Sequence, residues 1–119
     1  MPDFSAVFAD LRGVLAPYAE TLVVVHDDAS QLYLNTRHLQ KNKQTLFFGA
    51  VQVKKAHVSF HLMPVYLQPE LLAQAPPALK ARMQGKSCFN FATAQPELFQ
   101  ALAALTQAGY KSYQAQGFV

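Results

Sequence analysis

Charged residues are scarce in this 119-residue chain, at 14% of the sequence against about 25% in a typical soluble domain. Seven acidic residues stand against ten basic ones, which gives a formal net charge of +3. The basic residues form neither a dense run nor a repeat with aromatic residues, which argues against a nucleic-acid partner. A surface this short of charge favours covering apolar area by association. We therefore expect a homodimer.

Cysteine is nearly absent as well, because Cys88 is the only one in the sequence. A lone cysteine excludes an intrachain disulfide and fits a reducing compartment. No apolar run approaches the roughly 20 residues that cross a bilayer. The first residues also lack the basic start and long apolar segment of a signal peptide. We expect a cytoplasmic protein without a membrane span.

Hydrophobic residues make up 51% of the chain, which is enough for the core of one domain over residues 1–119. Helices are predicted where apolar residues recur every three to four positions or where proline opens a segment. The predicted helices are 4–15, 68–72, 77–85, and one from about 93–96 to Gly109. Asp3 is the expected N-terminal cap of the first. Strands are predicted where residues are β-branched or alternate in polarity: 21–26, 31–36, 46–53, 57–62 and 87–91.

This order groups the strands instead of alternating each strand with a helix. Grouped strands predict an α+β fold, with a mainly antiparallel sheet of about five strands and helices packed on one face. The other face of the sheet is then left partly open.

The segment 57–62 is the most informative of the predicted strands. It alternates strictly, with Val58, Phe60 and Leu62 pointing one way and polar residues pointing the other. The polar side would belong to the open face of the sheet, which makes that face the candidate surface for function. Residues with the same outward parity on their strands are Tyr33, Asn35, His57, Ser59, His61, Cys88 and Asn90.

Four basic residues lie at the ends of predicted elements and could converge on one rim, although solvated charges are the more common role of such residues. They are Lys54, Lys55, Arg82 and Lys86. Such a rim could hold a carboxylate- or phosphate-bearing ligand. Residues 85–87 (Gly-Lys-Ser) match the end of a phosphate-binding loop. Lys80 stands where that loop needs its first glycine, so the motif is absent.

Metal binding and catalysis are the alternatives to simple ligand binding. His57 and His61 would lie about 13 Å apart along a strand, too far for bonds of roughly 2.0 to 2.1 Å to meet at one ion. A metal site would need neighbouring strands, for example His26 with Asp27 or Asp28. Cys88 could act as a nucleophile if a histidine across the sheet lowered its pKa. A lone cysteine in a strand more often fills space.

Two segments carry a resemblance to a known family. They are residues 55–60 (Lys-Ala-His-Val-Ser-Phe) with Leu62-Met63-Pro64 after them, and residues 85–91 (Gly-Lys-Ser-Cys-Phe-Asn-Phe) before the last helix. Over roughly residues 30–110 the chain resembles the YdhG-like superfamily of bacterial domains of unknown function. The resemblance implies an α+β fold similar to that of secretion chaperones. One relative is described as a frataxin-like iron chaperone, but iron-delivering surfaces are acidic and the seven acids here are scattered.

We expect a small, non-enzymatic protein that binds an anionic small molecule or a partner protein through the open sheet face, without a cofactor or a metal. An iron-handling chaperone, and an enzyme that uses Cys88 or His57, are the alternatives. The residues expected to bind the ligand are Tyr33, Asn35, Lys55, His57, Ser59, His61, Arg82, Lys86 and Asn90.

Overall fold

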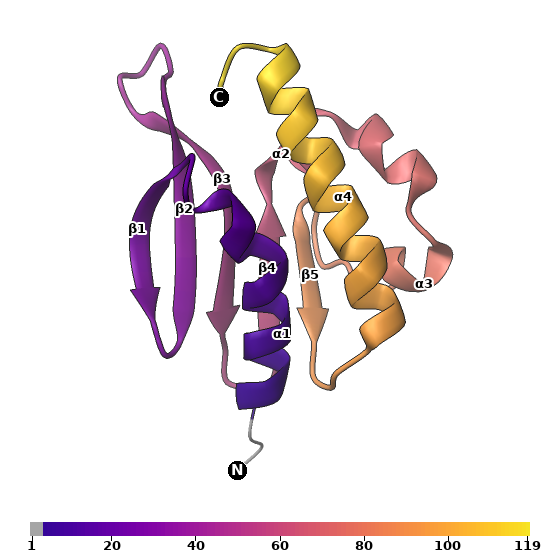
Figure 1. The fold of residues 1–119 in the computed structure, drawn as a ribbon. Helices are drawn as coiled ribbons and strands as arrows, with labels where there is room; N and C mark the ends of the chain where they lie inside the picture. Colours follow the sequence, from indigo (N-terminus) through magenta and orange to yellow (C-terminus); the bar gives the residue numbers. More distant parts are fainter. Residues whose placement is uncertain (1–3) are drawn as a thin grey trace.

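A five-stranded antiparallel sheet forms the centre of the computed structural model, which describes residues 4–119. Each strand pairs with the next one along the chain, so the order in space is the order in sequence (Figure 1). The sheet and its helices confirm the predicted α+β fold. The strands are β1 (Val23–Asp28), β2 (Gln31–Leu39), β3 (Thr45–Val53), β4 (Val58–Leu62) and β5 (Cys88–Phe91).

The two long helices, α1 (Ser5–Leu15) and α4 (Pro96–Ala115), lie across the same face of the sheet (Figure 1). Shorter helices connect β4 to β5 and pack against α4. They are α2 (Met63–Leu67), the 3-10 helix η2 (Pro69–Gln74) and α3 (Pro77–Lys80); a second 3-10 helix, η1 (Ala16–Tyr18), follows α1. In residues 4–119, no helix combines the length and the apolar character that crossing a membrane requires.

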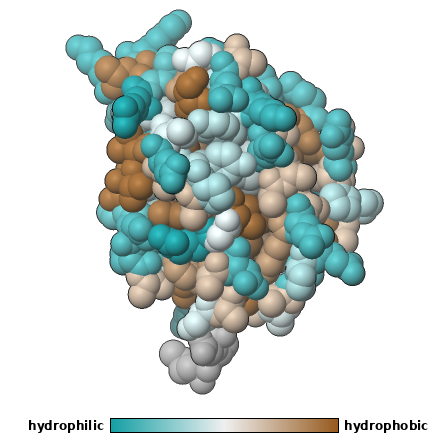
Figure 2. Space-filling model, viewed as in Figure 1, coloured by the Kyte–Doolittle hydropathy of each residue, from teal (hydrophilic) through white to brown (hydrophobic). Residues whose placement is uncertain are grey.

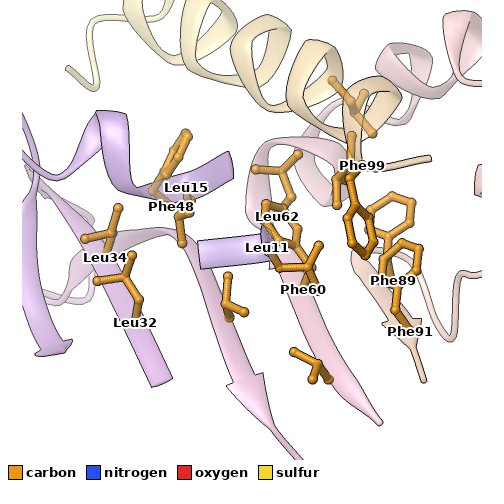
Figure 3. Packing of buried hydrophobic residues seen from close by; sticks show 14 of the residues in the cluster. Leu11, Leu15, Leu32, Leu34, Phe48, Phe60, Leu62, Phe89, Phe91 and Phe99 are labelled. Atoms are coloured by element: carbon orange, nitrogen blue, oxygen red, sulfur yellow. The ribbon is translucent and has the colours of Figure 1, made fainter. Parts of the chain in front are cut away.

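One hydrophobic core fills the space between the helices and the covered face of the sheet (Figure 3). Val58, Phe60 and Leu62 of β4 are fully buried in it, as predicted, but Ser59 between them is also buried, so exposure along β4 does not alternate as expected. Phe99 of α4 meets Phe91 of β5 edge-on, with ring centroids 4.9 Å apart. Other fully buried core side chains are Leu11, Leu15, Leu32, Leu34, Phe48 and Phe89.

Gly109 does not end the last helix, contrary to the prediction, because α4 continues to Ala115. The glycine is buried, and a Cβ built on it would lie 2.9 Å from the Cβ of Pro64 in α2. The missing side chain therefore lets two helices approach closely. Stopping a helix and allowing close approach are both roles of glycine, and a single sequence does not separate them. Asp3, the expected cap of the first helix, lies outside the described residues.

The predicted helix over 77–85 is also wrong after Lys80. The following residues run along the outer edge of β5, where Asn90 N donates to Arg82 O and Gln84 N donates to Cys88 O, both at 2.9 Å. This pairing covers one edge of the sheet. The opposite edge is β1, whose six residues are all exposed.

Candidate binding surface

The sheet face opposite the helices carries the outward-pointing residues, and the strand register arranges them in rows. One row across the five strands contains His26, Tyr33, Ala50, His61 and Cys88. The next row contains Asp28, Gln31, Gln52, Ser59 and Asn90. Asn35 and Phe47 pair beyond Tyr33. We call these twelve residues the open face.

Side chains of β4 and β5 form a hydrogen-bonded polar cluster on the open face. Ser59 Oγ donates to Asn90 Oδ1 at 3.1 Å, and Asn90 Nδ2 donates to Gln84 Oε1 at 2.8 Å. The Cys88 thiol donates to the same Asn90 Oδ1 at 3.3 Å, and its Sγ lies 3.9 Å from His61 Nε2. Ser59 is only 3% exposed. The cluster, defined as these five residues, is therefore held in place before any ligand arrives.

The pKa shifts in the polar cluster favour neutral side chains. Burial lowers the pKa of His61, and the positive charge of Lys54 adds a smaller lowering. Burial raises the pKa of the Cys88 thiol, against smaller lowering effects of the Ser59 hydrogen bond and Lys54. At neutral pH the imidazole is therefore uncharged and the thiol keeps its proton. A histidine does lie across the sheet from Cys88, but the thiol is not activated as a nucleophile would need.

The charges near the polar cluster favour an anion over a cation, because the carboxylate of the open face, Asp28, lies in the edge strand β1 and accepts hydrogen bonds from Ser30 and Gln31. Strands β2 to β5 contain no acidic residue. Lys54 lies close enough to the polar cluster to act on both His61 and Cys88. Asn90, Gln84 and a neutral His61 can all donate hydrogen bonds to an incoming oxygen.

A recess of about 450 Å³ lies beside the polar cluster, between β2, β3 and α2. Tyr33 and Phe47 stack along it with ring centroids 4.7 Å apart, and Tyr66 is 52% exposed at its rim. Asn35 Nδ2 donates to Thr45 Oγ1 at 3.1 Å, whereas Asn35 Oδ1 is buried without a partner among the described residues. We call this hollow the aromatic recess. Its remaining lining residues are Gln40, Gln44, Leu46, Met63 and Leu67.

The structure brings together five of the nine residues expected to bind ligand, in two neighbouring groups. Ser59, His61 and Asn90 belong to the polar cluster, while Tyr33 and Asn35 line the aromatic recess. His57 is not part of β4; it lies in the preceding turn, where its carbonyl accepts a hydrogen bond from Lys54 N at 2.8 Å.

The basic rim predicted from the sequence does not form. Lys55 precedes β4 and Lys86 precedes β5, and these neighbouring strands are antiparallel, so the two lysines lie at opposite ends of the sheet. Arg82 lies beside the outer edge of β5. The cation that acts on the polar cluster is Lys54, which the sequence placed only in the rim.

The sequence analysis missed Gln84 of the polar cluster and every residue of the aromatic recess except Tyr33 and Asn35; Phe47 and Tyr66 are the most prominent of these. Phe47 lies in an almost wholly apolar strand, and a register shift between β2 and β3 sets it opposite Asn35. Gln84 falls in the predicted helix 77–85, and Tyr66 lies between the predicted strand 57–62 and the predicted helix 68–72, where no element is expected. Alternation of polarity within one strand contains no signal for any of these contacts.

The alternative metal site at His26, Asp27 and Asp28 is not assembled. Arg12 Nη2 donates to both carboxylate oxygens of Asp27, at 2.9 and 3.0 Å. Asp28 Oδ1 accepts from Ser30 N at 2.8 Å and from Gln31 N at 3.1 Å. Within residues 4–119, no three His, Cys, Asp or Glu side chains are grouped closely enough to hold an ion.

No protein-family model, curated protein or solved structure matches this chain. The resemblance to the YdhG-like superfamily therefore stays a prediction, and the function has to be argued from the open face itself.

Proposed function

We propose that this protein is a small binding domain that holds an anionic small molecule on the open face. The observation that carries the proposal is the polar cluster, fixed by its own hydrogen bonds, within electrostatic range of Lys54 and on strands without a carboxylate. A preorganised set of donors costs little ordering entropy when a ligand binds. The nearby cation then favours an acceptor that carries negative charge.

The aromatic recess suggests what the rest of the ligand is like. Tyr33 and His61 flank Ala50 in one row, so two strand spacings, about 10 Å, separate their backbones. A molecule with a flat ring and a carboxylate or phosphate can span this distance. The ring would lie against Tyr33 and Phe47, and the acidic group would reach the polar cluster.

Catalysis by Cys88 has less support than binding. The raised pKa keeps the thiol protonated at neutral pH, and Asn90 accepts its hydrogen bond where a nucleophile would need a base. A partner protein covering the exposed Tyr66 is the remaining possibility for this surface. It would appear in the experiment below as an absence of response to every small probe.

Titration of the ¹⁵N-labelled protein, followed by NMR, tests the proposal with three probes: benzoate, its neutral analogue benzamide, and inorganic phosphate. We expect saturable shifts in the amides of Ser59, His61 and Asn90 with benzoate, and additional shifts around Tyr33. Benzamide should bind more weakly because it lacks the charge. A Kd near 1 mM, about −4.1 kcal/mol, is reasonable for a fragment of this size.

Two exposed lysines provide a matched pair of variants. Lys54→Gln should weaken benzoate binding about two- to fivefold, the range expected of an exposed charge pair. Lys111→Gln removes the same charge from the exposed side of α4 and should leave the affinity unchanged. The proposal fails if no probe gives saturable shifts on the open face. It also fails if the two lysine variants weaken binding equally.

A further inference from the structure

The outer edge of β1 has no strand partner in the part of the chain that the structure describes. β1 is the first strand of the sheet, and among the described residues it pairs only with β2. The other edge of the sheet is covered by residues 82–84, which bond to β5. A bare edge presents a row of free N–H and C=O groups that another strand can pair. One edge of this sheet is therefore closed and the other is open.

The open edge is also apolar. Val23, Val24 and Val25 are 38%, 44% and 43% exposed, and Leu39 at the end of β2 is exposed as well. Hydrophobic atoms are visible along the left margin of the surface, where β1 lies (Figure 2). Three consecutive exposed valines have high β propensity and gain from burial.

The usual protection of an edge strand is weak here. Neither lysine nor proline occurs in β1. Its two carboxylates are engaged within the chain, since Asp27 is held by Arg12 from α1 and Asp28 caps the turn at Ser30. A β-bulge between Val24 and His26 is present and shortens the regular part of the edge.

We propose that a second copy of this chain pairs with β1 in antiparallel orientation, joining the two sheets into one across a two-fold axis. A second copy brings the same unpaired edge and the same three valines, so each copy satisfies the groups that the other leaves open. Parallel pairing would set Asp27 and Asp28 beside their counterparts. Antiparallel pairing places the two acidic ends at opposite ends of the interface, which fixes the orientation.

The contact is short, so the dimer should be weak. One strand of six residues with a bulge buries less than a standard interface. We expect a Kd of roughly 10 to 100 µM. The interface uses the edge of the sheet and leaves the polar cluster and the aromatic recess of the same copy free. A test of the dimer is therefore independent of a test of the proposed ligand.

Sedimentation equilibrium from about 1 µM to about 1 mM measures the association, a range that brackets the expected Kd. Val24→Lys should weaken it at least tenfold, because an edge lysine opposes pairing. Leu67→Lys is the matched control: Leu67 is also 44% exposed, but it lies in α2 at the aromatic recess. Unchanged circular dichroism and thermal unfolding of Val24→Lys would show that the variant is folded.

Disulfide crosslinking locates the contact. In a Cys88→Ser background, the variants Val23→Cys, Val24→Cys and Val25→Cys are oxidised one at a time. A residue beside the two-fold axis faces its own copy at the Cα separation that a disulfide needs. The proposed pairing through the three valines puts the axis among them, so at least one variant should give a covalent dimer in high yield. Leu67→Cys should not.

A chain that stays monomeric to about 1 mM would overturn the proposal. So would a dimer that Val24→Lys leaves intact, or one that Leu67→Cys crosslinks and the three β1 variants do not.

Discussion

Replacing Gly109 with alanine tests the closest helix contact behind the aromatic recess. Gly109 of α4 faces Pro64 of α2, and a new Cβ would lie 2.9 Å from the Cβ and 3.1 Å from the Cγ of that proline. Both are atoms of a rigid ring, so the overlap cannot be relieved by a rotamer change. Helix α2 must move away from α4. Because α2 also supplies Met63, Tyr66 and Leu67 to the recess, one recess wall should shift with it.

A second glycine, which lacks such a neighbour, provides the reference for the expected change in the free energy of unfolding. Gly13 of α1 is exposed, and a Cβ built there meets nothing within 4 Å. Gly13→Ala should therefore stabilise the protein by about 1 kcal/mol, the helix propensity of alanine over glycine. Gly109→Ala gains the same propensity, but overpacking costs about 1 to 3 kcal/mol. The difference between the variants, about 1 to 3 kcal/mol, isolates the contact with Pro64.

Urea unfolding of the wild type and both variants measures these free energies, and thermal unfolding provides a check. For 119 residues, 1 kcal/mol corresponds to a Tm change of about 4 °C. If Gly109→Ala is as stable as Gly13→Ala, the close approach of α2 and α4 does not exist. The aromatic recess would then need a different description.

Two further predictions concern the polar groups that position the site. Tyr113→Phe removes the hydroxyl that donates to Phe47 O at 2.8 Å, behind the aromatic recess. It should lower the free energy of unfolding by about 1 to 2 kcal/mol in urea titration, and no loss would contradict the bond. Because the pKa of His61 is lowered in the folded protein, His61 of the unfolded chain is protonated at a higher pH than His61 of the folded protein. Stability should fall as the pH drops from about 6.5 toward the lowered pKa. His61→Gln should remove this part of the pH dependence in unfolding measured between about pH 5 and pH 7.5, and the control His38→Gln should retain it. An equal effect of both variants would refute the assignment.

The aspects of the fold that depend on local periodicity could be predicted from the sequence. The alternation in 57–62 placed Val58, Phe60 and Leu62 in the core, and the structure buries all three. The apolar stripe of the first helix and the grouping of the strands predicted the helix layer and the antiparallel sheet. These features depend on neighbours a few residues apart, which a sequence records directly.

The candidate site depended on information that no local pattern contains. The register sets His61 beside Cys88 and Ser59 beside Asn90, residues about thirty positions apart. A shift in register places Phe47 opposite Asn35 and so builds one wall of the aromatic recess. The antiparallel order also separates Lys55 from Lys86, which is why the predicted basic rim was wrong.

The sequence by itself determined which side of β2, β4 and β5 is apolar, because side-chain direction alternates with every residue and these three strands alternate in polarity. Tertiary structure decided which polar side chains meet on the open face, how Gly109 is used, and which sheet edge stays bare. These outcomes depend on the register between strands and on close contacts between helices. Both are set by the packing of residues that lie far apart in the chain.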